Sequence, residues 1–439
     1  MKRNILHIGL FGLVLVWGGG LAAAPAETGN VVASPAVAPS GSWASVLQRA
    51  EARLAQNLIS EADLASAQAE QARANGWLAG APIVSGLYRN DQVMSDFGAV
   101  EMQADVRLPL RRLGQSEAWR ALAEQAALNA ETRALADRLA LLGVLRELAW
   151  DWRRAEVVLA AAMTRNEMMQ RNVQAVTLQV KRGEVAEVER LSVESRALGV
   201  QDAVAEAQVL RDNALQRWVR VSGGESLPLD LGVDDAAIAH SMNDSMLDTP
   251  EGLLEKQPLL RQMANEVGLT TARIQAERAA GAGAPELSLG VKRDRGDRAV
   301  PYDNSLFVSL SLPLGGEAYR EPALAEMSQQ RAAAQVALIK TTQQLLGDMA
   351  ALRQRLKVWP ARLVRLDQAA ALAEKTLELK QKALRQGELD WSLLLNFERE
   401  AADARLQAQL AHIAYAQDKS RLKQALGVMP DVAALSAAH

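Results

Sequence analysis

Few residues of this 439-residue chain have the types and spacing that metal binding or catalysis needs. The chain has no Cys, and after one His near its start the others, His240, His412 and His439, are far apart. No set of His, Asp and Glu has the spacing of a zinc or iron site. We find no nucleophile elbow, phosphate-binding loop or metalloprotease motif either. The sequence therefore predicts no enzyme, no metal site and no cofactor.

Two other groups of residues invite a functional interpretation. Six carboxylates between Asp230 and Glu251 could bind cations, but they lack the spacing of a calcium loop, which favours a solvated linker. Trp150 and Trp152 resemble a stacking pair, but on a helix we expect them to pack in the interior. A net charge of −3 gives no reason to expect nucleic acid as a partner.

The first 26 residues have the pattern of a secretory signal peptide. Lys2 and Arg3 precede an apolar run, and Ala24-Pro-Ala26 fits a cleavage site for small residues. A transmembrane anchor is the alternative, because the run is nearly long enough to span a bilayer. Glycines 18–20 interrupt the run, which favours cleavage and an exported mature chain.

The chain contains two copies of one long unit. Matching residues are Pro109 and Pro313, Gly183 and Gly387, and Gly223 and Gly427, each pair 204 positions apart, while Pro82 and Pro285 are 203 apart. A period this long is not that of a solenoid. We expect a signal peptide at 1–26, an extended arm at 27–42, a first repeat at 43–223, a linker at 224–250, a second repeat at 251–428 and a tail at 429–439.

Each copy contains a predicted β-hairpin, at about 83–110 and 286–314. Apolar and polar residues alternate there over a length that suits a transmembrane strand. The apolar positions include Val106, Leu108, Leu310 and Leu312, expected to face lipid, and the polar positions include Asp105, Arg107, Ser309 and Ser311, expected to face a lumen. A hairpin with one face on a soluble core is the alternative, but the recurrence of the hairpin and the length of the helices favour the first interpretation.

The predicted helices are unusually long. Residues 118–179 and 322–385 would make helices of about 93 and 96 Å, with Pro360 predicting a kink or local unwinding near Trp359. Shorter helices at 44–76 and 187–221, and at 252–280 and 390–426, add up to similar lengths when stacked end to end. Hydrophobic content is 49% but aromatic content only 4%, as in closely packed helices. The predicted fold is mainly α, with long coiled-coil-like helices and two hairpins.

Four strands per chain cannot close a barrel, and open strand edges are not tolerated in lipid. Three copies would supply twelve strands, an even number in the known range, around a water-filled lumen. The sequence therefore predicts a homotrimer, with a twelve-stranded β-barrel on an α-helical barrel.

This ordered set of features resembles the TolC-type outer membrane efflux family. Each hairpin begins near Ala-Pro, each leaves through Leu-Pro-Leu into a long helix, and each long helix ends at Gly-Glu before a second helix that ends near Leu-Gly. The resemblance implies an efflux duct in the bacterial outer membrane, with a long periplasmic extension that docks to a periplasmic adaptor and a proton-driven inner-membrane pump. The Lys/Arg-x-Gly-Glu turns look most like the heavy-metal branch (cobalt–zinc–cadmium), which implies metal cations as cargo.

The resemblance also implies roles for the turns. Gly183, Glu184, Gly387 and Glu388 would form the periplasmic tip and contact the adaptor, although the glycines are also ordinary helix terminators and the glutamates ordinary solvated charges. Family members with an acidic constriction carry it six and nine residues beyond the second tip glycine. Leu393 and Asn396 stand there in this chain, and Glu189 at the six-residue step of the first copy. We therefore expect a hydrophobic or mixed gate.

Two rival hypotheses remain at this point. The chain could be a soluble periplasmic adaptor or scaffold with coiled-coil hairpins, or an enzyme on a helical scaffold. An adaptor gives no reason to repeat a strand face of membrane dimensions, and the enzyme hypothesis lacks a supporting set of residues.

Overall fold

The computed structural model describes residues 42–54, 57–93, 97–224, 226–228, 249–315 and 320–429. The predicted signal peptide, the arm up to Gly41, most of the acidic linker and the tail after Met429 lie outside these residues. Within the described ranges, none of the helices is both long and apolar enough to cross a membrane.

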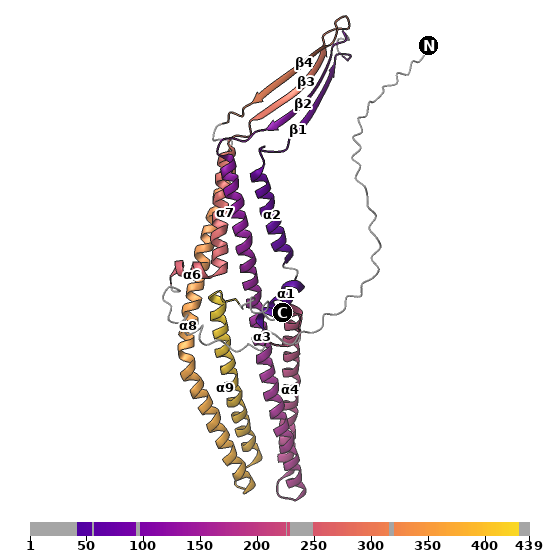
Figure 1. Ribbon diagram of the computed structural model, residues 1–439. Coiled ribbons are helices and arrows are strands. Elements are labelled where there is room, and N and C mark those ends of the chain that lie inside the picture. The colour runs from indigo at the N-terminus through magenta and orange to yellow at the C-terminus, as the bar shows by residue number, and fades with distance from the viewer. Residues whose placement is uncertain are drawn as a thin grey trace, which may run out of the picture. The chain divides into compact units, whose positions relative to one another are not determined.

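The described elements occur in the same order twice: two helices, two strands and two helices (Figure 1). The first half comprises α1 (Trp43–Arg53), α2 (Asn57–Asn75), β1 (Ile83–Asn90), β2 (Val100–Pro109), α3 (Gln115–Lys181) and α4 (Glu187–Ser222). The second comprises α6 (Pro250–Lys256), α7 (Pro258–Ala280), β3 (Glu286–Arg295), β4 (Asp303–Ser311), α8 (Glu321–Arg385) and α9 (Trp391–Ala425). The predicted duplication of a mainly helical unit, with one hairpin in each copy, is confirmed.

The four strands form one antiparallel sheet in the order β1-β2-β3-β4. The central pair, β2 with β3, joins the two repeats, with Val106 opposite Leu289. The sheet lies at one end of the helices, and the turns α3–α4 and α8–α9 lie at the other (Figure 1). Strands β1 and β4 form the edges of this sheet.

The two long helices have 67 and 65 residues, which correspond to about 100 and 98 Å. The helix α3 contains no Pro, and α8 contains one after its first turn, Pro360. Although Pro360 lacks an N–H, α8 remains α-helical through it, so the predicted local unwinding near Trp359 does not occur.

The shorter helices stack end to end along the long ones, as predicted, with α2 and α4 along α3. Two expected continuous helices are nevertheless divided. The segment 44–76 breaks after α1, which ends at Arg53, and the segment 252–280 breaks at Gln257. Gln257 has an extended backbone (φ −91°, ψ 113°) because the ring of Pro258 disfavours the helical conformation of the residue before it.

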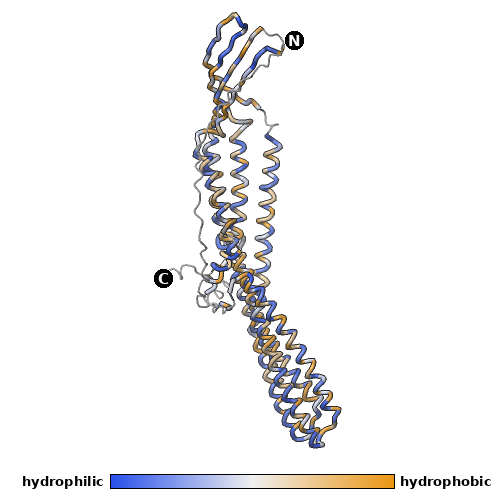
Figure 2. The backbone as a smooth tube through the Cα atoms, turned by 90° about the vertical axis from the view of Figure 1, so that its right-hand side faces the viewer, coloured by the Kyte–Doolittle hydropathy of each residue, from blue (hydrophilic) through white to orange (hydrophobic). Residues whose placement is uncertain are grey.

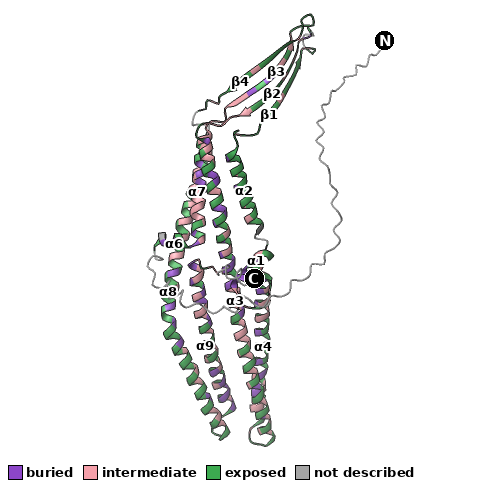
Figure 3. Cartoon of the chain, viewed as in Figure 1, coloured by how far each residue is buried: buried purple, intermediate pink, exposed green. Residues whose placement is uncertain are grey.

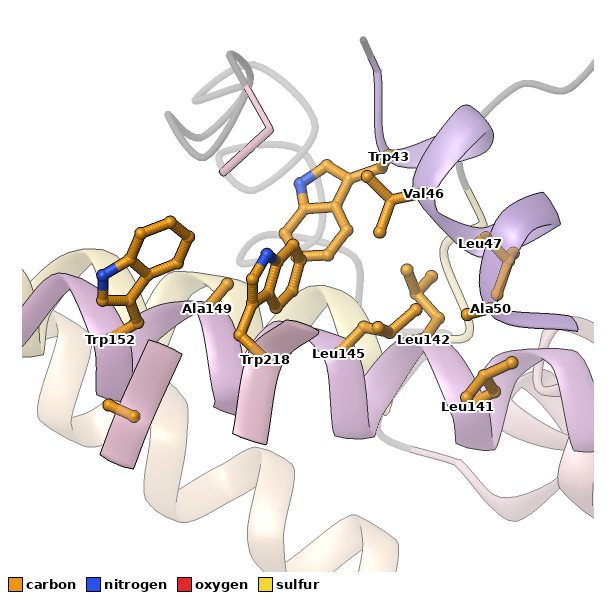
Figure 4. Close-up of a cluster of buried hydrophobic side chains, with 11 residues drawn as sticks. Trp43, Val46, Leu47, Ala50, Leu141, Leu142, Leu145, Ala149, Trp152 and Trp218 are labelled. Carbon is orange, nitrogen blue, oxygen red and sulfur yellow. The ribbon is translucent and has the colours of Figure 1, made fainter. Parts of the chain in front are cut away.

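Buried side chains gather where the short helices meet. In the first repeat, Trp218 of α4 is fully buried between two other tryptophans (Figure 4). Its ring centroid lies 6.5 Å from that of Trp43 of α1, in an edge-to-face arrangement, and 6.3 Å from that of Trp152 of α3. In the second repeat the equivalent of Trp218, Leu422, is also fully buried. Trp150 and Trp152 are both buried, so their predicted packing role is confirmed.

Two adjacent arginines tie the sheet to the helices. Arg111 donates to the carbonyl oxygens of Ala74 (2.8 Å), in the last turn of α2, and of Leu78 (3.1 Å), just after α2. Arg112 donates to the carbonyl oxygens of Gly283 (2.9 Å) and Pro313 (3.1 Å) in the second repeat. The segment after β2 therefore anchors the connections of both repeats.

Candidate functional site: two glycine turns and a two-faced sheet

The turns at Gly183 and Gly387 share one geometry. Both glycines are left-handed, with φ of 75° and 78°. Gly183 N–H donates to the Val180 carbonyl (2.9 Å) and Glu184 N–H to that of Gln179 (2.9 Å), while Gly387 and Glu388 donate to the corresponding carbonyls of α8. This pair of bonds is the Schellman ending of a helix, which needs positive φ and so favours glycine.

The two turns lie close together. Trp391, at the start of α9, donates its indole N–H to the side-chain oxygen of Gln179, near the end of α3, at 2.7 Å. A buried cluster beneath the turns includes Val176, Val193 and Leu394. The two turns therefore form one end of the helical region, as the sequence predicts, and we call this end the tip.

The acidic residues after the tip glycines are exposed. Glu184 lies 3.9 Å from Arg182, and both side chains are at least half exposed, so this ion pair contributes little stability. Glu388 is also exposed. The carboxylates are therefore available to another molecule.

The predicted constriction residues have different environments. Leu393 and Asn396 lie on the exposed side of α9, and Arg196 of α4 donates to the Asn396 side-chain oxygen at 3.4 Å. Glu189 is half-buried in the first turn of α4. Neither position 393 nor position 396 of α9 carries a carboxylate, so we still predict a hydrophobic or mixed gate.

One carboxylate near the tip was missed by sequence reasoning. Glu398 of α9 is buried, and its Oε2 accepts from the side chain of Asn172 in α3 at 2.6 Å. Burial raises the pKa of Glu398 above its ordinary value, although hydrogen bonds from Asn172 and Gln381 oppose the shift. The sequence offered one sign of this buried carboxylate, which is that a Glu stands among the apolar positions of α9.

A second buried carboxylate joins α8 and α9 beside Pro360. Asp418 is 1% exposed; its Oδ2 accepts from the Trp359 indole N–H at 2.7 Å and its Oδ1 lies 2.8 Å from Arg355. These bonds fix the residue that precedes Pro360, which helps to explain why α8 does not unwind there.

The strand register places most polar and most apolar residues on opposite faces, although Ile83, Leu87 and Phe307 lie in rows of the polar face. Arg107, Ser288 and Ser309 lie in one row across the sheet, and Val106, Leu289 and Val308 in the next row on the opposite face. The alternation predicted for Asp105, Arg107, Ser309 and Ser311 against Val106, Leu108 and Leu310 is therefore present. Leu312, which was predicted to lie in the strand, lies just outside it, because β4 ends at Ser311.

The polar face carries its own hydrogen bonds. Asp105 is 6% exposed and accepts from Ser85 (2.7 Å), Arg107 (3.1 Å) and Gln103 (3.2 Å). Glu101 accepts from Arg89 and lies 3.2 Å from Lys292. This face is therefore built for water or for its own polar partners.

The apolar face has no partner within the described residues. Leu306 is 78% exposed, Val308 64% and Leu310 57%. Most residues of the edge strands β1 and β4 are exposed, whereas most residues of β2 and β3 are half-buried or buried (Figure 3). Apolar and polar residues alternate along the strands (Figure 2). A contiguous apolar face of this kind normally marks an interface with lipid or protein.

Comparisons with known proteins identify the fold of the chain but do not assign it to a family. No family model matches the chain, and no curated protein matches it. Solved structures do match over most of their length. The CmeC outer membrane channel of Campylobacter jejuni is 13% identical, covering 90% of this chain and 88% of that one, with a TM-score of 0.67.

Two further structures give the same result. The open state of the MtrE outer membrane channel of Neisseria gonorrhoeae is 18% identical, covering 88% of each chain, with a TM-score of 0.65. CusC, described in terms of transmembrane channel formation, is 15% identical, covering 88% of this chain and 92% of that one, with a TM-score of 0.69. The chain therefore has the fold of these channels.

Proposed function

We propose that this protein is the outer membrane duct of a tripartite efflux pump. Three copies close a twelve-stranded barrel in the outer membrane, and their helices form a tunnel through the periplasm. Substrate moves passively through this duct, while a proton-driven inner-membrane pump and a periplasmic adaptor deliver it. No catalytic step is required of the chain.

The observation that carries this proposal is the unpartnered four-stranded sheet. It has an apolar face with Val308 and Leu310 more than half exposed, and two edges, β1 and β4. Lipid can cover such a face only if the edges are paired, because an unpaired backbone group in hydrocarbon costs several kcal/mol. Pairing β4 of one copy with β1 of the next closes the sheet. The likeness of fold to outer membrane channels supports the same arrangement.

The tip and its cargo are part of the proposal. We assign Gly183, Glu184, Gly387 and Glu388 to contact with the adaptor, on the strength of their position at the end remote from the sheet and the exposure of both glutamates. Leu393, Asn396 and Glu189 line the constriction. Metal cations are the proposed cargo, which rests on the resemblance of the two turns to the heavy-metal branch.

The soluble adaptor remains the alternative function. It would need another protein to cover the apolar sheet face. Cell fractionation separates the two: a duct remains with the outer membrane after washing with high salt, whereas an adaptor is released into the periplasmic fraction.

Restoration of export tests the proposal directly. Cells that lack their own outer membrane channel would be given this chain together with its cognate adaptor and pump, and then challenged with toxic metal salts. We expect resistance only when all three proteins are present. Resistance without the chain, or outer membrane insertion without any export of metals or drugs, would contradict the function or its cargo respectively.

A further inference from the structure

The charged residues of the sheet are divided unequally between its faces. Eight of the charged strand residues lie on the polar face by register: Arg89, Glu101, Asp105, Arg107, Glu286, Lys292, Asp294 and Asp303. The apolar face carries two, Arg293 and Arg295, and no carboxylate. Positive charge therefore stands alone on the face that the proposed duct turns toward lipid.

Both arginines lie at the sheet end remote from the helices. They follow Val291, the last apolar residue of β3 on this face, by two and four positions, or about 7 and 14 Å along the strand. Arg293 lies opposite Met102, and Arg295 opposite Val100. On this face the apolar residues of β3 and β4 thus end at Arg293 and Asn304, while β2 continues with Met102 and Val100. In the proposed duct this is where the bilayer gives way to headgroups.

An aromatic ring holds the two guanidinium groups together. Arg293 lies 4.5 Å and Arg295 4.7 Å from the ring centroid of Tyr302, which directly precedes β4. Tyr88 of β1 lies in the same row as Arg293 and is 61% exposed. Tyrosines at the border of an apolar band are typical of the interfacial girdle of membrane barrels. We call Arg293, Arg295 and Tyr302 the arginine rim.

The charges of the rim are not neutralised within the described residues. Neither arginine has a carboxylate partner there, although Arg295 also donates to the Gly98 carbonyl at 3.1 Å. By contrast, Arg89 and Lys292 on the polar face both pair with Glu101. Guanidinium forks match the oxygens of phosphate. Stacking on Tyr302 leaves the N–H groups in the plane of each guanidinium able to donate, apart from the Nε–H of Arg295, which donates to Gly98.

We propose that the arginine rim binds the phosphate-bearing headgroups of anionic lipids in the outer leaflet. The inference rests on the proposed function, because it places this end of the sheet at the outer surface. Each bound headgroup would fix the depth of the barrel and cover the arginines, which otherwise border hydrocarbon. A zwitterionic lipid has no net negative charge, because an ammonium group offsets its phosphate, and should bind more weakly.

Native mass spectrometry of the full-length protein in detergent tests the proposal. Phosphatidylglycerol and phosphatidylcholine with the same acyl chains would be titrated separately. We expect the wild type to prefer the anionic lipid by on the order of thirtyfold, about fivefold for each arginine. The double variant Arg293→Gln/Arg295→Gln should lose the preference, and rising salt should weaken it in the wild type.

The matched control removes two arginines from the opposite face. Arg89→Gln/Arg107→Gln changes the net charge equally, and Glu101 and Asp105 keep other partners, so the lipid preference should remain. Equal preferences in wild type and rim variant, or equal loss in the control, would overturn the proposal. Displacement of the lipid by an excess of inorganic phosphate would identify a free-phosphate site instead and overturn it too. A monomeric wild type would contradict the trimeric duct, whereas lipid binding per chain would still be read from the same spectra.

Discussion

Glycines of this chain serve two different purposes, and the backbone separates them. Gly387 has a φ of 78°, and a Cβ there would meet nothing within 4 Å. Its replacement is therefore costly for the backbone alone. Gly347 in α8 also has open space around it, but it lies in a regular helix, where Ala is the better residue.

We expect Gly387→Val to abolish efflux while the protein remains trimeric and inserted. A β-branched residue at positive φ strains the turn by on the order of 1–2 kcal/mol or more, and the sheet lies at the other end of the helices. Gly347→Ala should be stabilising by about 0.5–1 kcal/mol with export unchanged. Resistance and crosslinking to the adaptor would be measured on both variants.

The neighbouring carboxylate separates contact from strain. Glu388→Lys leaves the backbone of the turn intact but reverses an exposed charge. We expect weaker crosslinking to the adaptor and lower resistance. Wild-type behaviour of both Gly387→Val and Glu388→Lys would show that the tip is assigned wrongly.

The buried Glu398 predicts a pH dependence of helix stability. Because its pKa is raised in the folded chain, the folded state binds more protons than the unfolded state between the ordinary and the raised value. Its contribution therefore falls as pH rises through that window. Glu398→Gln should flatten this pH dependence, so the stability of the variant relative to the wild type should be greater at neutral pH than at acidic pH. Thermal unfolding at several pH values would check it, and an unchanged profile would contradict the assigned burial effect.

Among the elements, two prolines show how far sequence reasoning reaches. Pro360 predicted a kink or local unwinding, and the unwinding does not occur: α8 stays α-helical there, with the neighbouring Trp359 bonded to Asp418 of α9. Pro258 has the same local signal and does divide its helix, where Gln257 also donates to the Ala425 carbonyl at 2.8 Å. The two sites share the restriction that proline places on the residue before it, but they differ in their contacts with distant residues, which no sequence pattern reveals.

The α8–α9 contact should be sensitive to Asp418→Asn. The variant keeps an acceptor for Trp359 but loses the charge that faces Arg355, which should cost about 1–3 kcal/mol. Asp403→Asn is the control, because Asp403 and Arg165 are partly exposed and 3.5 Å apart, and such pairs contribute about 0–1 kcal/mol. The midpoint of thermal loss of the helical signal would be compared. Equal shifts of the midpoint in the two variants would show that Asp418 stabilises the α8–α9 contact no more than the exposed Asp403 does.

The strand faces make a second prediction at this level. Leu310→Arg should destabilise the inserted barrel by about 2–4 kcal/mol if Leu310 lies near the bilayer midplane, while Ser309→Arg should be far milder. Both residues lie next to each other in β4, so local strand propensity is matched. Unfolding by urea in lipid vesicles measures the difference, and similar losses would show that the faces are not lipid and lumen.

For the whole molecule, the constant offset between the repeats was the most useful signal. It predicted the duplication, while the alternation of apolar and polar residues predicted the hairpins and the helix lengths predicted the end-to-end stacking. The pairing of β2 with β3 could not be read from it, because either hairpin satisfies the alternation pattern alone. Arg111 and Arg112 were missed for a related reason: their partners are backbone carbonyls of distant segments, which leave no trace in residue type.

Three copies should associate in detergent. The unpaired edges β1 and β4 and the apolar face supply the reason. Light scattering with the detergent contribution subtracted gives the mass of the protein part, and crosslinking with a short reagent gives the number of copies. A stable monomer with an intact β signal would contradict the proposed closure.

The β2–β3 pairing can form only some time after β2 has been synthesised. Strand β2 ends at Pro109 and β3 begins at Glu286, so 177 positions separate the two ends of this pair. At a synthesis rate of about 5–20 residues per second, the first hairpin waits roughly 10–35 s before its partner strand exists. During that interval its free backbone groups are open to pairing with other nascent chains. The newly made polypeptide should therefore depend on a holding chaperone until the second repeat is complete.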